Sequence, residues 1–144
     1  MIEQPKILIV EDDLDVVEAM KVVLESKKYR VISANDGKEG LEKAKSEKPD
    51  LIILDVMMRH ETEGFKVTQT LRRNEQTKYI PILMVTAITQ KTGFPFSPET
   101  DGEFLPVDDY VEKPVQPDDL LLRVEKLLQL PEEKINIEGR KSIL

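Results

Sequence analysis

The sequence predicts an α/β domain in which helices cover both faces of a doubly wound, five-stranded parallel sheet. Two observations lead to this prediction. Short apolar stretches alternate along the chain with stretches that have the spacing of amphipathic helices, which is the order of βαβ units. The apolar stretches are also continuous rather than alternating, as expected of strands that are buried on both faces.

The first half of the chain begins with a predicted strand at residues 6–10. A helix is expected next, because Asp13 is a suitable N-cap and the apolar residues after it recur on one stripe. These residues are Val16, Val17, Met20, Val23 and Leu24. A second strand is expected at residues 29–34, followed by a weaker helix at residues 38–48.

The second half continues the alternation. A strand is predicted at residues 50–54, a helix at 64–74 and a strand at 80–85. The fifth strand, at residues 109–111, has the weakest signal because it is short. The last helix, at residues 117–128, has a proline at its first position and another shortly after its end, which is the usual punctuation of a helix.

Two segments interrupt the pattern. Residues 88–106 occupy the place of a fourth helix, but their prolines and glycines predict that this helix is shortened or irregular. Residues 131–144 form a charged tail with few apolar side chains, and we expect this tail to be flexible. The predicted organisation is therefore one domain at residues 1–130 with a C-terminal tail at 131–144.

Composition narrows the classes of function. A chain of 144 residues, 40% of them hydrophobic, can bury one core. The absence of cysteine excludes a disulfide scaffold, a thiolate zinc site and a cysteine nucleophile. A net charge of −7 opposes direct binding to nucleic acid or to an anionic membrane. Apolar runs are too short to cross a bilayer and no signal region is visible, so we expect a cytoplasmic location.

Polar residues follow the predicted strands at the points where they end. Glu11 and Asp12 follow the first strand, Asp55 the third, Thr86 the fourth and Lys113 the fifth. A flavodoxin-like strand order of 2-1-3-4-5 brings these carboxyl ends to one edge, where such sheets bind ligands. Three carboxylates, a hydroxyl and an ammonium would then share one crevice.

The chemistry of such a cluster is specific. Adjacent carboxylates repel one another unless they are neutralised, and a hard divalent cation such as Mg²⁺ takes oxygen ligands. A carboxylate beside the metal can act as a nucleophile toward phosphorus, while an ammonium offsets the charge of the transferring group.

With these residues in view, the chain resembles the response-regulator receiver domains of two-component signalling, the CheY-like family, from about residue 6 to residue 128. Four motifs together carry the resemblance, although each alone is weak. They are KILIVEDD at residues 6–13, DLIILDVMM at 50–58, IPILMVTA at 80–87 and DDYVEKP at 108–114.

The resemblance implies a role for each residue of the cluster. Asp55 is the phosphoacceptor, and Thr86 and Lys113 hold the phosphoryl oxygens. Thr86 and Tyr110 form the conformational switch, and the peptide bond between Lys113 and Pro114 is often cis in the family. The implied ligands of Mg²⁺ are Glu11, Asp12, Asp55 and the backbone carbonyl of Met57.

The resemblance also implies a signalling phosphoprotein rather than a turnover enzyme, one that assists its own phosphorylation and dephosphorylation. The expected phosphoryl donor is a sensor histidine kinase or a phosphotransfer protein. We expect a stand-alone receiver, because the tail is too short for an output domain. The output is then an interaction with an unknown downstream protein or a homodimer.

Two departures from the family leave a second reading open, a receiver-like scaffold that binds partners without phosphorylation. Arg59 stands where the family usually has proline, and the segment between Thr86 and Lys113 is longer than usual. A third reading, an aspartate-nucleophile phosphohydrolase, requires a second aspartate where Met57 stands. A nucleotide-binding module is disfavoured because the first strand is not followed by a glycine-rich phosphate loop.

Overall fold

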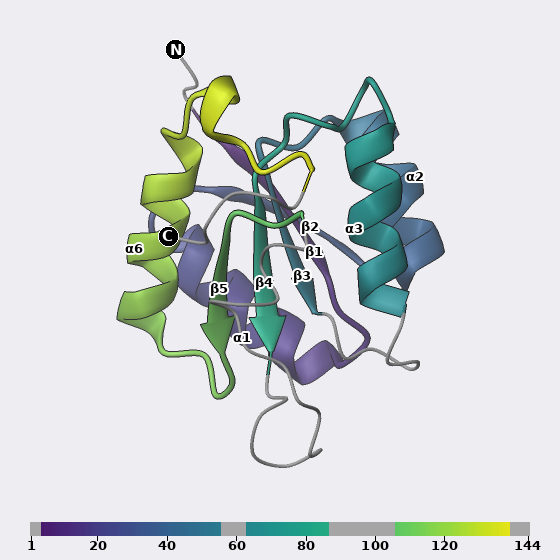
Figure 1. Ribbon diagram of the computed structural model, residues 1–144. Coiled ribbons are helices and arrows are strands. Elements are labelled where there is room, and N and C mark those ends of the chain that lie inside the picture. The colour runs from purple at the N-terminus through teal and green to yellow at the C-terminus, as the bar shows by residue number, and fades with distance from the viewer. Residues whose placement is uncertain (1–3, 56–62, 87–105, 139–144) are drawn as a thin grey trace.

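Five parallel strands form a single sheet in the order β2-β1-β3-β4-β5, which confirms the predicted fold class (Figure 1). The computed structural model describes residues 4–55, 63–86 and 106–138. The strands are β1 (Lys6–Val10), β2 (Arg30–Ala34), β3 (Leu51–Asp55), β4 (Ile82–Thr86) and β5 (Asp109–Glu112). The helices are α1 (Leu14–Glu25), α2 (Gly37–Glu47), α3 (Glu63–Arg73) and α6 (Pro117–Leu128), followed by the 3₁₀ helix η1 (Glu132–Lys134).

The element boundaries lie close to those predicted. β4 begins at Ile82 rather than at residue 80, because Pro81 has no N–H group to donate to the ladder. Most of the expected irregular segment, residues 87–105, lies outside the described residues, so the prediction of a shortened fourth helix stays a prediction.

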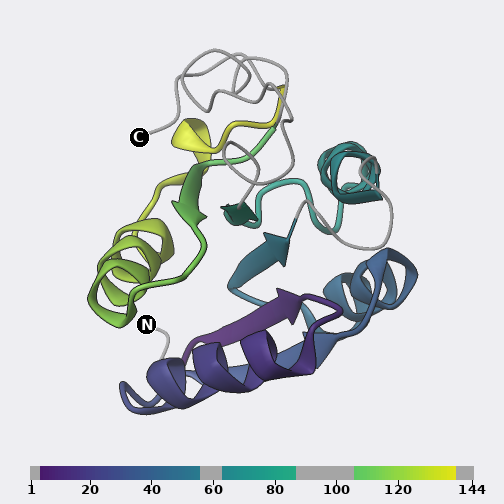
Figure 2. The same cartoon turned by 90° about the horizontal axis from the view of Figure 1, so that it is seen from below.

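Helices cover both faces of the sheet, with α1 and α6 on one face and α2 and α3 on the other (Figure 2). Alternate residues of the three central strands contribute to the two cores. Ile7, Ile9, Ile53, Leu83 and Val85 pack with α1 and α6. Leu8, Val10, Ile52, Leu54 and Met84 pack with α2 and α3. Both faces of these strands are therefore buried, as their continuous apolar sequence predicted.

Side-chain caps fix the start of two helices. Asp13 is the N-cap of α1, as predicted, and its Oδ1 accepts a hydrogen bond of 2.9 Å from the backbone N–H of Asp15. Asp36 caps α2 in the same way, accepting from Glu39 N at 2.9 Å. Because α1 begins directly after its N-cap Asp13, the connection from β1 is short. Glu11 and Asp12 therefore lie at the carboxyl edge of the sheet.

The start of the C-terminal tail packs against the domain. Ile135 and Asn136 are buried, and Asn136 hydrogen-bonds to residues just before β5. Residues 131–138 therefore differ from the flexible arm expected from the sequence, because Ile135 is buried and the Asn136 side chain bonds to buried Val107, 29 positions earlier. Residues 139–144 lie outside the described residues.

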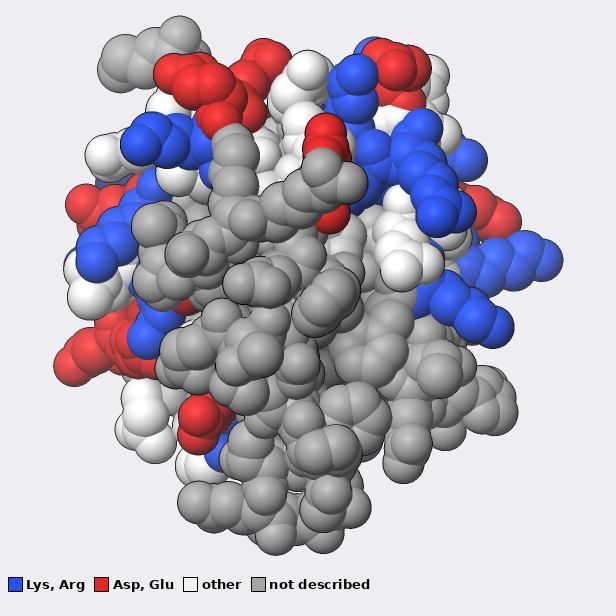
Figure 3. Space-filling view, viewed as in Figure 1, with Lys and Arg blue, Asp and Glu red and all other residues white. Residues whose placement is uncertain are grey.

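Basic side chains are unevenly distributed over the face shown in Figure 3. Although the net charge is −7, Lys and Arg side chains gather beside and over α3 on the face shown in Figure 3.

Within the described part of the chain, every helix is too short or too polar to cross a lipid bilayer.

Candidate functional site

The parallel register brings the ends of four strands to one edge of the sheet. Val10 lies opposite Leu54, so Glu11 and Asp55 are neighbours at the ends of β1 and β3. Asp55 in turn lies opposite Val85, and Thr86 lies opposite Glu112. The described residues at the carboxyl ends of β1, β3, β4 and β5 therefore face a common space.

Three carboxylates meet at this edge. One oxygen each from Glu11, Asp12 and Asp55 lies within 4.8 Å of the other two. The side chains of Glu11 and Asp55 are buried, with 1% and 2% of each residue exposed, whereas Asp12 is half-buried. Asp13 is not part of the group, in agreement with its predicted role as a cap.

Lys113 supplies the positive charge of the cluster. Its Nζ donates a hydrogen bond of 3.0 Å to Asp55 Oδ2 and lies 3.1 Å from Glu11 Oε1. Its backbone N–H donates to the carbonyl of Thr86 at 2.8 Å, which fixes the residue against the end of β4. The peptide bond between Lys113 and Pro114 is cis.

Lys113 alone does not neutralise the carboxylates. Burial, together with the hydrogen bond and the charge of Asp55, raises the pKa of Glu11 to about 8. Burial by itself would lower the pKa of Lys113, but the charges and hydrogen bonds of Asp55 and Glu11 outweigh it and raise that pKa. The cluster therefore carries more negative charge than its single ammonium offsets.

The cluster fits a hard divalent cation. Glu11 Oε1 is the one buried side-chain atom of the described residues that makes no hydrogen bond of good geometry, and its contact with Lys113 Nζ at 3.1 Å is an ion pair. Oxygen ligands and excess negative charge are what a bound Mg²⁺ needs. Met57, which the resemblance gives as a further ligand, lies outside the described residues.

The two proposed switch residues lie on neighbouring strands. Thr86 is buried at the end of β4, and Tyr110 lies half-buried on β5 opposite Met84. The guanidinium of Arg123 lies 5.6 Å from the centre of the Tyr110 ring. Arg123 also pairs with Asp109 at 2.7 Å, so one side of the ring is held by α6.

Sequence reasoning missed Arg123 and a second group of polar residues around Asp108. Arg123 had a local signal, because Asp119 stands four positions before it and pairs with it at 2.8 Å. The buried pair of Arg72 and Asp108 spans 36 positions and leaves no comparable pattern in the sequence.

The chain matches the family model of the response regulator receiver domain over residues 7–125. It is 40% identical over 127 residues to the alkaline phosphatase synthesis transcriptional regulatory protein PhoP of Bacillus subtilis, which covers 88% of this chain and 50% of PhoP. It is 39% identical over 125 residues to the DNA-binding dual master transcriptional regulator RpaA of Synechocystis sp., covering 87% and 49% of the two chains. The chain thus spans about half the length of these curated relatives.

Solved structures show the same likeness. The chemotaxis response regulator CheY4 of Vibrio cholerae superposes with a TM-score of 0.74 at 32% identity, covering 86% of this chain and 98% of CheY4. The receiver domain of the Francisella response regulator 1452 gives a TM-score of 0.73 at 28% identity, covering 88% and 98% of the two chains.

Proposed function

Because this chain belongs to the response-regulator receiver family, we propose that it is a signalling domain in which Asp55 accepts a phosphoryl group in a Mg²⁺-dependent reaction. One observation carries the proposal: the Asp55 carboxylate, buried between Glu11 and the ammonium of Lys113, belongs to a cluster with excess negative charge. Receiver domains in general bind Mg²⁺ at an acidic pocket, and the domain is a signalling module rather than a turnover enzyme.

Asp55 is the nucleophile in this reaction. An oxygen of its carboxylate attacks phosphorus, and the bond between phosphorus and the leaving group of the donor breaks. The leaving group departs with the electron pair of that bond, and an aspartyl phosphate results. Glu11, Asp12 and Asp55 are the residues that would hold Mg²⁺, and the bound ion supplies positive charge beside the phosphoryl oxygens.

Lys113 and Thr86 stabilise the transferred group. Lys113 Nζ donates to Asp55 Oδ2 before transfer and is placed to donate to a phosphoryl oxygen afterwards. The hydroxyl of Thr86, at the end of the adjacent strand, donates to another phosphoryl oxygen. Its movement toward Asp55, with a matching movement of Tyr110, would shift the domain between two states.

The proposed donor is a sensor histidine kinase or a phosphotransfer protein, since these are the partners of receiver domains. The output is an interaction with a downstream protein or a homodimer. The alternative, a scaffold that acts without phosphorylation, rests on the sequence departures at Arg59 and between Thr86 and Lys113.

A small phosphodonor such as acetyl phosphate tests the proposal directly. Incubation with Mg²⁺ should add one phosphoryl group, detected by intact-protein mass spectrometry. The added mass should be absent in Asp55→Asn and when a chelator replaces Mg²⁺. Size-exclusion chromatography of the same samples reports whether phosphorylation changes the oligomeric state. Failure of the wild-type protein to gain mass under any of these conditions would favour the scaffold.

A further inference from the structure

Asp108, the residue just before β5, makes two hydrogen bonds to Ile82, the first residue of β4. Its backbone N–H donates to the carbonyl of Ile82 at 3.0 Å, and its side-chain Oδ2 accepts from the N–H of Ile82 at 2.8 Å. One residue therefore satisfies both backbone groups of its neighbour. A side chain that replaces a backbone acceptor in this way adds a bond to the β4–β5 ladder at its amino end.

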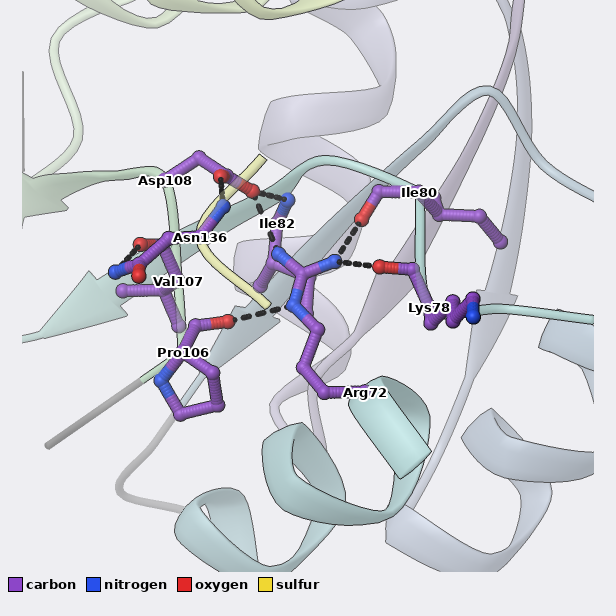
Figure 4. A network of polar contacts seen from close by, with 8 residues as sticks. All are labelled: Arg72, Lys78, Ile80, Ile82, Pro106, Val107, Asp108 and Asn136. Atoms are coloured by element: carbon purple, nitrogen blue, oxygen red, sulfur yellow. Dashed lines mark hydrogen bonds and ion pairs between the residues drawn. The ribbon is translucent and has the colours of Figure 1, made fainter. Parts of the chain in front are cut away.

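The Asp108 carboxylate is held on two further sides (Figure 4). Arg72 Nη2 donates to Oδ2 at 2.7 Å, and the backbone N–H of Asn136 donates to Oδ1 at 2.8 Å. The side chains of Arg72 and Asp108 are only 2% and 1% exposed. A buried carboxylate with three donors has little freedom to turn, so the bond to Ile82 is fixed.

Arg72 is itself anchored on several carbonyls. Its Nε donates to Pro106 O at 2.8 Å, and its Nη1 donates to Lys78 O at 2.9 Å and Ile80 O at 2.7 Å. Figure 4 shows the guanidinium surrounded by these acceptors and by Asp108. The end of α3, the approach to β4 and the approach to β5 are therefore tied together at one point.

The register of β5 against β4 depends on contacts of this kind. β5 has four residues and, among the described strands, pairs with β4 alone. A slip of one position reverses the face toward which every side chain of a strand points. The ladder runs from the pair of Ile82 and Asp108 at one end to the bond from Lys113 N to Thr86 O at the other.

We propose that Asp108 is a positioning residue for the phosphorylation site. By fixing the register of β5 against β4 it sets the reach of Lys113 to Asp55, although it lies at the opposite end of the strand and touches neither residue. The inference rests on the proposed function, because the consequence of misplacing Lys113 is measured as phosphoryl transfer.

Two double variants isolate the oxygen of Asp108. In Arg72→Met with Asp108→Asn, the amide oxygen can still accept from Ile82 N. In Arg72→Met with Asp108→Ala, that acceptor is gone. Both variants lack the buried charge pair and lose the same donors to carbonyls, so neither contains an unpaired buried charge. Thr77→Ala, which removes a buried bond of 2.6 Å to Leu71 O away from the ladder, controls for lowered stability.

The readouts separate positioning from general loss of structure. We expect the alanine double variant to be labelled by acetyl phosphate at least about ten-fold more slowly than the asparagine double variant, since small misplacements lower rates strongly. Mg²⁺ affinity, measured by calorimetry, should not fall in the alanine variant, because the three carboxylates lie on β1 and β3 or beside them and a displaced Lys113 no longer competes for Glu11 and Asp55. Amide hydrogen exchange at Lys113 should be faster in the alanine variant.

Equal labelling rates in the two double variants would overturn the inference. A parallel loss of Mg²⁺ affinity, or an equal loss of rate in Thr77→Ala, would overturn it as well, because the effect would then be general. If the wild-type protein is not labelled, the proposed function fails. The effect of Asp108 on the register of β5 is then tested by hydrogen exchange alone. Equal exchange at the Lys113 amide in the alanine and asparagine double variants would refute it.

Discussion

Lys113 Nζ and Asp55 Oδ2 lie 3.0 Å apart although 58 positions separate the two residues in the chain. Lys113 follows the edge strand β5, and its side chain crosses the end of β4 to reach Asp55 on β3. The contact exists only because three parallel strands end at the same level. The chemistry of the site is therefore a product of the sheet topology.

Replacing Lys113 with glutamine should slow phosphorylation of Asp55 by about 10- to 100-fold, because a positioned donor to the developing charge is lost. Mass spectrometry after timed incubation with acetyl phosphate measures the rate. Lys126→Gln, which removes an exposed lysine of α6, is the matched control and should be labelled like the wild type. Equal rates for both variants would remove Lys113 from the mechanism.

The metal-free protein should lose stability as pH rises from about 5 to about 8. The pKa of Glu11 is about 8 in the folded protein, against 4.5 for the unperturbed group. The folded state therefore keeps a proton that the unfolded state releases, and ionising Glu11 within the fold is unfavourable. Thermal unfolding in chelator at several pH values measures this slope.

Two controls identify the group responsible for that slope. Glu11→Gln cannot ionise at this position, so its stability should depend less on pH than that of the wild type. Added Mg²⁺ should restore stability at the higher pH, since the ion offsets the charge. A slope that is unchanged in Glu11→Gln would assign the effect to another group.

Gly40→Ala should lower the free energy of unfolding by about 1–2 kcal/mol, as overpacking does. A Cβ atom at Gly40 would lie 2.9 Å from Val10 Cγ2 and 3.0 Å from Val10 Cγ1, closer than packed atoms tolerate. Combining it with Val10→Ala makes room, so the two substitutions should be less harmful together than the sum of their separate effects. Chemical denaturation of all four proteins gives the coupling, and strict additivity would count against this contact.

Asn136→Ala should lower the free energy of unfolding by about 1–2 kcal/mol, because a buried carbonyl loses its donor. Asn136 Nδ2 donates to Val107 O at 3.0 Å, and both residues are buried. Lys134→Ala, which changes an exposed residue of η1, should have little effect in the same denaturation experiment. Equal stability of the Asn136 variant and the wild type would show that this side-chain hydrogen bond contributes nothing.

Local patterns in the sequence were enough for the sheet and for much of the site. Continuous apolar runs marked the strands, and polar residues directly after them, such as Glu11 and Asp55, marked the edge where ligands bind. The meeting of Glu11, Asp12, Asp55 and Lys113 follows from parallel strands alone. The roles proposed for these four residues, and for Thr86 and Tyr110, remain predictions.

Contacts between distant segments were not accessible in the same way. Arg72 and Arg73 are adjacent in the sequence, and nothing local shows that the first is buried and the second exposed. Asn136 stands in a charged tail whose composition predicts flexibility, and its burial depends on an acceptor, Asp108, 28 positions earlier. Such pairs are decided by packing, which composition and periodicity do not encode.

The first and last helices of the domain, α1 and α6, cover the same face of the sheet. Residues such as Met20 and Leu24 share one apolar cluster with Val124 and Leu127, so the beginning and the end of the domain protect each other from water. A fragment that stops before α6 would expose the part of that cluster that α6 covers. The domain should therefore unfold in a single cooperative transition, in which α1 and α6 lose their structure together.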